Sequence, residues 1–114
     1  MNLGHYGEDI AANYLQNKGY KVIDRNFRCR LGEIDIVAGK GKVLVFVEVK
    51  TRRGVNYGLP CESVTMEKLN HIRRAASIYA LKNSLMDVQQ RIDVIEVLCL
   101  GEKAYIKHTE NVFS

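Results

Sequence analysis

Two stretches of the 114-residue chain carry apolar residues at the three- and four-residue spacing of an amphipathic helix. The first pattern runs from residue 3 to residue 18, and Gly19 is well placed to end it. Its apolar positions are Leu3, Gly7, Ile10, Ala11, Tyr14 and Leu15. The second pattern has Met66, Leu69, Ile72, Ala76 and Tyr79 on one face, with Ser63 or Thr65 as candidate N-caps. The spacing therefore predicts an early helix and a second helix in the latter half of the chain.

Elsewhere the apolar residues alternate with polar ones or form short runs, as they do in β-strands. The predicted strands cover residues 21–30, two segments within 31–51 joined by a tight glycine-containing turn, 91–100 and 103–108. Residues 53–64 have no sustained periodicity and predict a surface loop. The order α-β-β-β-α-β-β predicts an α/β fold with a mixed sheet flanked by helices. At this length a single domain over residues 1–114 is expected.

The most apolar strand, VLVFVEVKTR at residues 43–52, has two different faces. Side chains alternate across a strand, so the valines share one face, which belongs to a core. Along the other face the side chains change from apolar to charged, in the order Leu44, Phe46, Glu48, Lys50 and Arg52. The preceding strand repeats the pattern: Glu33, Asp35 and Val37 fall on one face and Ile34, Ile36 and Ala38 on the other. Each strand is therefore expected to carry a polar edge.

The turn between these two strands decides whether their polar edges meet. A two-residue type II′ loop requires glycine at its first position, which favours Gly41-Lys42 as the loop. This choice pairs Lys40 with Val43, Val37 with Phe46, and Asp35 with Glu48. Directly opposed residues have Cβ atoms about 4.5–5.5 Å apart, and like charges there are destabilising. A cation is therefore expected between Asp35 and Glu48.

An arginine, Lys50 or a divalent metal could supply that cation. Two converging carboxylates offer the oxygen ligands that Mg²⁺ prefers, with room for water. Lys50 would then lie beside the metal, where it could position a water or offset negative charge on a phosphoryl group. This layout suits phosphodiester hydrolysis. The alternative is that the alternating Glu and Lys form a solvated face, which is the more frequent arrangement on strands.

Charge and composition bear on partners and location. The formal charge of +4 is compatible with a polyanionic partner, and five arginines bracket the central hairpin: Arg25, Arg28, Arg30, Arg52 and Arg53. We expect them to hold the phosphates of a nucleic acid. The three cysteines lack the spacing of a zinc site or a disulfide framework. No leader or membrane-spanning stretch is evident, so we expect a cytoplasmic protein without membrane contact.

The motifs GEIDIVA (residues 32–38) and VFVEVKTR (residues 45–52) closely resemble the YraN-like family of uncharacterised bacterial proteins. That family is itself similar to the PD-(D/E)xK nuclease superfamily, and to archaeal Holliday-junction resolvases in particular. The likeness extends over most of the chain, through GEDIAANYL (residues 7–15), the Gly19-Tyr20 and Arg25-Asn26 pairs, Lys68, and RIDV (residues 91–94). It implies a restriction-endonuclease-like fold with an αβββαβ core, in which two central strands present the active site.

The resemblance also implies residue roles. Asp35 matches the motif aspartate, Glu48 the acidic residue of the E-x-K element, and Lys50 its lysine, although Ile34 stands where many members have proline. Glu8 matches a glutamate that many members supply from the first helix. A helical wheel places Glu8 beside the apolar stripe and Asp9 away from it. Glu8 is equally well explained as a charge favourable to the helix dipole.

Other residues have weaker claims. Glu33 is an extra metal ligand or, more simply, a solvated residue. Lys68 borders the apolar face of the second helix and could reach the site or extend its ammonium group to solvent. Tyr57 could stack on a base or merely pack on the surface. His5, His71 and His108 have no spacing that suggests a triad or a metal cluster.

The interpretation with most support is a Mg²⁺- or Mn²⁺-dependent endonuclease-like protein acting on DNA, branched or structured DNA being one option. Asp35 and Glu48 would bind the metal, Lys50 would assist the attacking water, and Glu8 would support the metal or its water shell. The alternative is a non-catalytic module that keeps the fold and binds nucleic acid or a protein partner. Related resolvases act as dimers, so a homodimer is compatible with the resemblance.

Overall fold

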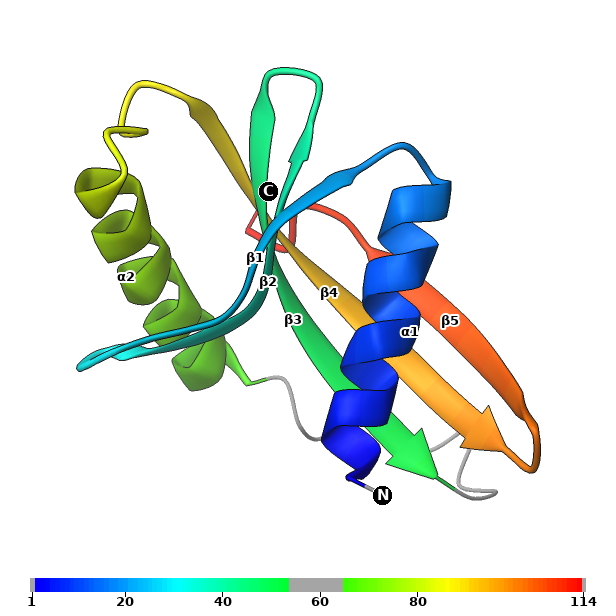
Figure 1. Cartoon of the computed structure of the whole chain (residues 1–114). Coiled ribbons are helices and arrows are strands. Elements are labelled where there is room, and N and C mark those ends of the chain that lie inside the picture. The colour runs from blue at the N-terminus through cyan, green and yellow to red at the C-terminus, as the bar shows by residue number, and fades with distance from the viewer. Residues whose placement is uncertain (1, 54–64, 114) are drawn as a thin grey trace.

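The computed structural model describes residues 2–53 and 65–113, and its helices and strands follow the order that the sequence predicts. They are α1 (Leu3–Asn17), β1 (Lys21–Cys29), β2 (Gly32–Lys40), β3 (Val43–Arg53), α2 (Met66–Lys82), β4 (Gln89–Leu100) and β5 (Lys103–Thr109) (Figure 1). Thr65 is the N-cap of α2. Most of the predicted loop, with Tyr57 and Ser63, lies outside the described residues. Neither helix combines the length and the apolar character that crossing a membrane requires, among the residues that the structure describes.

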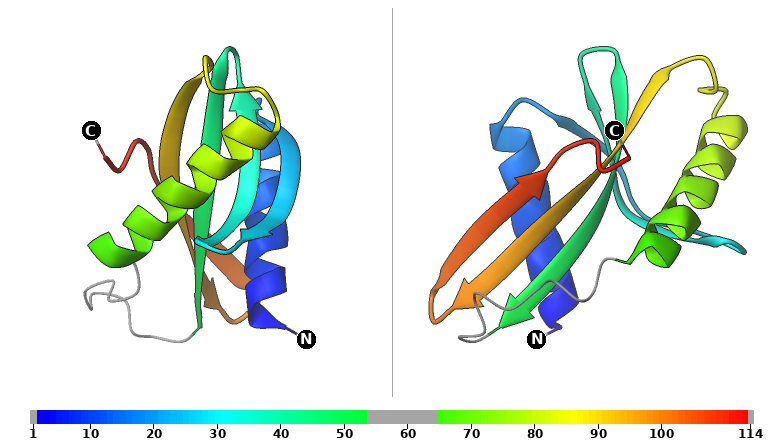
Figure 2. Two further views of the ribbon diagram at one scale, coloured as in Figure 1. Left: turned by 90° about the vertical axis from the view of Figure 1, so that its left-hand side faces the viewer. Right: turned by 180° about the vertical axis from the view of Figure 1, so that it is seen from behind.

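The five strands form one sheet in the order β1-β2-β3-β4-β5. Strands β3 and β4 are parallel and all other neighbours are antiparallel, so the expected mixed sheet is confirmed. Helix α1 covers one face of the sheet and α2, which lies between β3 and β4 in the chain, covers the other (Figures 1 and 2). The arrangement is consistent with the αβββαβ core of a restriction-endonuclease-like fold.

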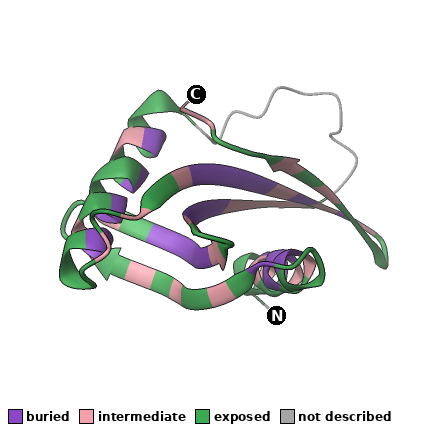
Figure 3. Ribbon diagram, turned by 90° about the horizontal axis from the view of Figure 1, so that it is seen from above, coloured by how far each residue is buried: buried purple, intermediate pink, exposed green. Residues whose placement is uncertain are grey.

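Strand β3 contributes to a hydrophobic cluster on each side of the sheet. Its residues Val45 and Val47 pack toward α1, whereas Leu44 and Phe46 pack toward α2. The buried positions lie along the middle of the sheet and on the sides of the helices that face it (Figure 3). Each fully buried aliphatic side chain stabilises the fold by about 1.5–3 kcal/mol. The prediction that the valine face of β3 belongs to a core is therefore confirmed.

The β2–β3 hairpin has the predicted turn and register. Lys40 pairs with Val43, and Val37 pairs with Phe46. Gly41 has φ of +59°. A positive φ at the first loop position is what a two-residue type II′ turn requires, and glycine adopts it without strain.

The paired part of the hairpin is shorter than predicted. The β2–β3 ladder ends at the pair Ile36–Val47, one residue before Asp35 and Glu48 would oppose each other. Beyond it, β1 and β2 curve away from β3 toward the N-terminal end of α2 (Figure 1). The Asp35 side chain bridges the gap, because its Oδ2 accepts a hydrogen bond from the Val49 N–H at 2.8 Å. The two acids therefore meet where the strands separate and not as rungs of the ladder.

The predicted alternation of β2 is wrong at Ile34. This residue packs in the α2-side cluster together with Val37, while Ile36 packs on the α1 side. The cause lies in β1, where Asn26 adopts a left-handed conformation with φ of +57°. Asparagine tolerates this conformation better than most residues. Asn26 and Asp35 stand between the pairs Arg25–Ile36 and Phe27–Ile34, so the strands rotate at this point and the faces exchange.

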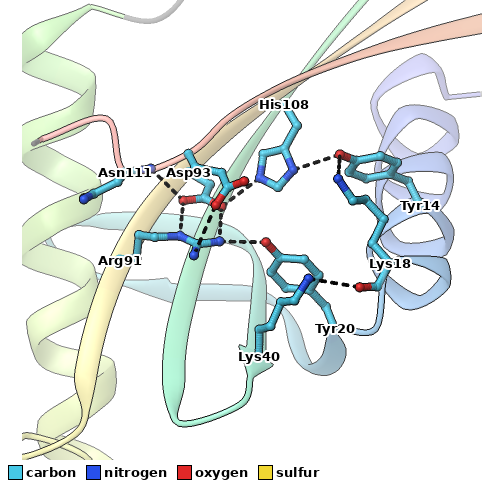
Figure 4. A network of polar contacts seen from close by, with 9 residues as sticks. Tyr14, Lys18, Tyr20, Lys40, Arg91, Asp93, His108 and Asn111 are labelled. Atoms are coloured by element: carbon cyan, nitrogen blue, oxygen red, sulfur yellow. Dashed lines mark hydrogen bonds and ion pairs between the residues drawn. The ribbon is translucent and has the colours of Figure 1, made fainter.

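A buried polar network joins α1 to strands β4 and β5 (Figure 4). Asp93 is 0% exposed. Its partners are Arg91 through Nε and Nη2 (2.8 and 2.9 Å), His108 Nε2 (2.7 Å) and the Asn111 backbone N–H (2.9 Å). Tyr14 in α1 joins the network with its hydroxyl 3.0 Å from His108 Nδ1. Burial alone would raise the pKa of Asp93, but the bonds from Arg91, Asn111 and His108 outweigh it and hold that pKa below its ordinary value.

Candidate active site

A cleft of about 410 Å³ opens where β2 separates from β3. All four residues for which the sequence suggests a catalytic role line it: Glu8, Asp35, Glu48 and Lys50. They come from α1, β2 and β3. The wall also includes Glu33, Lys68 and His71. The fold thus collects acidic and basic side chains that lie up to 63 positions apart in the chain, from Glu8 to His71.

Asp35 and Glu48 are the most deeply placed of these acids. Asp35 is 8% exposed and Glu48 is 4% exposed. Burial, followed by the contact and charge of Asp35, raises the pKa of Glu48 from 4.5 to about 8, against the opposing influence of Lys68. Isolated buried carboxylates are unfavourable unless a cation compensates them. The site therefore keeps two acids together in surroundings that favour a positive partner.

Lys68, in the first turn of α2, supplies one such partner. Its Nζ lies 2.8 Å from Glu48 Oε2. This oxygen nevertheless lacks an aligned hydrogen bond within the described residues, so the contact is an ion pair of poor hydrogen-bond geometry. Contact with Glu48 is the main reason why the pKa of Lys68 is raised. The sequence suggested that Lys68 either reaches the site or snorkels, and the structure places it at the site.

Glu8 reaches the cleft because α1 lies very close to β3. Gly7 is buried, and a Cβ at that position would overlap the side chain of Thr51. The close approach leaves the Glu8 side chain 15% exposed, with Oε1 3.8 Å from Arg25 Nη2. Burial and then the charge of Asp35 raise the pKa of Glu8, although Asn26 and Arg25 act in the opposite direction. Glu8 thus belongs to the same electrostatic group as Asp35.

The donor set fits a hydrated divalent cation. Glu8 Oε1 and Glu48 Oε2 are buried oxygens with no hydrogen bond within residues 2–53 and 65–113. Those residues contain no group of three or more His, Cys, Asp or Glu side chains arranged to enclose a metal ion. Mg²⁺ does not need one, because it commonly binds through one or two carboxylates and keeps several waters. Asp35 and Glu48 are the pair best placed to hold it.

Lys50 lines the cleft on the β3 side. It is half-buried and makes no hydrogen bond or ion pair with another residue of the described segments. Its ammonium group is therefore available to a ligand in the cleft. Strand alternation puts Lys50 on the same side of β3 as Glu48, as the sequence predicts.

The five arginines that bracket the β2–β3 hairpin differ in their surroundings. Arg25 joins β1 to α1 through Asp9 at 2.8 Å. Arg28 pairs with Glu33 at 3.2 Å, and both of these side chains are largely exposed. Arg30 and Arg53 are exposed, and Arg52 is half-buried. The structure therefore leaves most of this basic group accessible, whereas Arg25 has a bridging position.

Comparison with known proteins identifies close relatives. A family model described as "Uncharacterised protein family UPF0102" matches residues 7–97. A UPF0102 protein of Alkaliphilus metalliredigens is 46% identical over 112 residues, which is 98% of this chain and 97% of the relative. The UPF0102 protein GSU0650 of Geobacter sulfurreducens is 51% identical over 112 residues, covering 97% of this chain and 88% of the relative. A solved structure titled "Crystal structure of SSO0001" matches at 18% identity with a TM-score of 0.38, over 98% of this chain and 52% of that one.

Proposed function

The chain belongs to the UPF0102 family, the YraN-like family that its motifs resemble, and we propose that it is a Mg²⁺- or Mn²⁺-dependent endonuclease acting on DNA. The observation that carries the proposal is the meeting of Asp35 and Glu48, both almost fully buried, in one cleft with Lys50. The GEID and EVK motifs that bear these residues resemble those of PD-(D/E)xK nucleases. Family membership by itself assigns no activity.

The acids hold the cation in this proposal. Asp35 and Glu48 would bind it, and Glu8 would hold water at the side of the cleft nearest α1. A bound divalent cation polarises the phosphodiester and lowers the pKa of a coordinated water. Because Glu48 and Asp35 repel each other in its absence, the site favours a doubly charged occupant.

The basic side chains act on the substrate. The Lys50 ammonium, which has no described partner, would orient the attacking water and offset the negative charge that develops on the phosphoryl oxygens. Arg28 on β1, Arg30 in the turn between β1 and β2, and Arg53 at the end of β3 are exposed and would contact flanking phosphates. Arg52 lies on the same strand as Lys50 and belongs to this group. Arg25, in contrast, would act mainly by holding β1 to α1.

Cleavage assays test the proposal. The protein would be incubated with linear, branched and single-stranded DNA in Mg²⁺, in Mn²⁺ and in EDTA. We expect metal-dependent cleavage that falls about 100-fold or more in Asp35→Asn and Glu48→Gln, because loss of a metal ligand exceeds the effect of losing its supporting partners. Glu102→Gln removes an exposed carboxylate from the β4–β5 turn and should leave cleavage unchanged.

Two outcomes would contradict the proposal. One is cleavage that survives both substitutions, which would indicate a contaminant or another site. The other is the absence of cleavage together with DNA binding that is indifferent to metal and to Glu48→Gln. That second result would favour a non-catalytic nucleic-acid-binding module that retains the nuclease-like fold, with a salt-dependent affinity set by its arginines.

A further inference from the structure

Lys68 lies outside the GEID and EVK motifs that bear Asp35, Glu48 and Lys50. Its backbone N–H donates to the Thr65 side chain at 3.1 Å, which fixes the start of α2. From there its ammonium group reaches Glu48 Oε2 at 2.8 Å. The charges of Asp35 and Glu33 act on the same ammonium group. A cation of the chain itself therefore stands beside the carboxylate that is proposed to hold a metal.

The two members of this ion pair differ in freedom. The Lys68 side chain is 44% exposed, whereas that of Glu48 is 5% exposed. Glu48 is fixed within a strand that pairs with β4 along its whole length. Lys68 has a long flexible stem and a way out to solvent, since it borders the open side of the cleft. If the pair separates, Lys68 is the member that moves.

We propose that Lys68 is an exchangeable counter-ion, which pairs with Glu48 in the metal-free protein and turns to the phosphates of a nucleic acid when a divalent cation takes its place. The inference rests on the proposed metal site and concerns its regulation. A single charge and a double charge of the same sign repel strongly at a separation of a few ångströms in a partly buried site. Lys68 and a divalent cation therefore compete for Glu48.

The exchange would couple metal binding to nucleic-acid binding. While Lys68 is paired with Glu48, it contributes nothing to a phosphate contact. Once released, it adds one positive charge at the side of the cleft that faces solvent. Metal should therefore strengthen nucleic-acid binding, and by linkage nucleic acid should strengthen metal binding by the same factor.

The first test measures metal affinity without any reaction. Calorimetric titration with Mg²⁺ and with Ca²⁺, another ion that prefers oxygen ligands, would compare Lys68→Met with the wild type. We expect binding that is tighter by about three- to tenfold, because the competing charge is gone. Lys82→Met removes the same charge from the last turn of α2, outside the cleft, and should change the affinity by less than about twofold.

The second test asks when Lys68 contacts nucleic acid. Binding of a labelled duplex would be followed by fluorescence anisotropy over a range of salt concentrations, in Ca²⁺ and in EDTA. With Ca²⁺, Lys68→Met should weaken binding and reduce the slope of log affinity against log salt by about one. In EDTA the substitution should have no effect. In the Glu48→Gln background Lys68 is already released, so Lys68→Met should weaken binding in EDTA as well.

The outcomes separate this inference from the proposed function. Metal binding that Lys68→Met leaves unchanged, or a loss of DNA affinity that is equal with Ca²⁺ and with EDTA, would overturn the counter-ion role and leave the endonuclease proposal intact. Absence of divalent-ion binding to the wild type would overturn both.

Discussion

Replacement of Glu48 by glutamine should make the metal-free protein more stable above neutral pH, although it removes an ion pair. Burial and the neighbouring Asp35 raise the pKa of Glu48 from 4.5 to about 8 in the folded protein. The unfolded chain, in which this pKa is ordinary, therefore releases its proton first as the pH rises. The free energy of unfolding is highest below about pH 4.5, falls as the pH rises toward about 8, and then levels off.

The size of the effect follows from the difference between the two pKa values of Glu48, 4.5 and about 8. Each pKa unit corresponds to about 1.4 kcal/mol, so the rise from 4.5 to about 8 lowers the stability by on the order of 5 kcal/mol at pH 8 and above. Glutamine keeps the shape of the side chain and has no proton to lose. The pKa of about 8 already includes the opposing effect of the ion pair with Lys68, so we expect a net gain of roughly 3–5 kcal/mol near pH 8, shrinking to nearly zero near pH 4.5.

Urea unfolding followed by circular dichroism measures this difference, with EDTA present, at about pH 5 and about pH 8. Glu102→Gln is the matched control and should change the free energy of unfolding by no more than about 0.5 kcal/mol at either pH. Adding Mg²⁺ should stabilise the wild type and leave Glu48→Gln unchanged, since a ligand stabilises only the state that binds it. A Glu48→Gln protein that is less stable than the wild type near pH 8 would refute the reasoning and make the ion pair with Lys68 a stabilising contact.

Two further substitutions test how the fold positions the site. Gly7→Ala places a methyl group against Thr51 and should destabilise the protein by about 1–3 kcal/mol, and Thr51→Ala should restore part of the loss. An unchanged midpoint of urea unfolding would contradict the close approach of α1 to β3. Asp93→Asn leaves Arg91 without its buried partner and should lower the stability by about 3–5 kcal/mol near pH 7. Because the pKa of Asp93 is lowered, its contribution to the free energy of unfolding is present above its ordinary pKa of 3.8 and is lost as the pH falls through the lowered pKa. Asp93→Asn should therefore lose less stability than the wild type on acidification. Parallel profiles of stability against pH would contradict this.

Local rules account for most of the fold. The helices follow from apolar periodicity, and the register of the central hairpin follows from one glycine, Gly41, whose conformation selects the turn. Alternation fails at Ile34 because the conformation of Asn26, on another strand, rotates the pair. A rule that treats each strand as regular cannot include this effect. Asn26 in β1 is a weak sequence signal of this rotation, since asparagine is common at left-handed positions.

The site was harder to predict where it depends on distant elements. A helical wheel gives the side of α1 on which Glu8 lies, but only the packing of Gly7 on β3 decides that Glu8 reaches the cleft. Lys68 lies at the border of an apolar stripe, and this position is compatible with contact or with solvent. The network around Asp93 draws on α1, β4 and β5, so no local spacing reveals it. Its one sequence signal is an aspartate within an apolar strand, which usually means a buried charge with partners.

The Asp35 carboxyl group has different neighbours on its two oxygens. Oδ2 accepts the hydrogen bond of the Val49 N–H, beyond the last pair of the β2–β3 ladder, so Oδ1 is the oxygen with more capacity for an ion in the proposed site. In the proposed metal site Asp35 would therefore bind the ion mainly through Oδ1, in an orientation that the sheet sets. An asparagine that kept the bond to Val49 through its amide oxygen would turn an NH₂ group toward the ion and repel it. In the proposed site this position therefore requires a side chain that accepts in both directions, so the integrity of the strand junction and the affinity for the ion would depend on one residue.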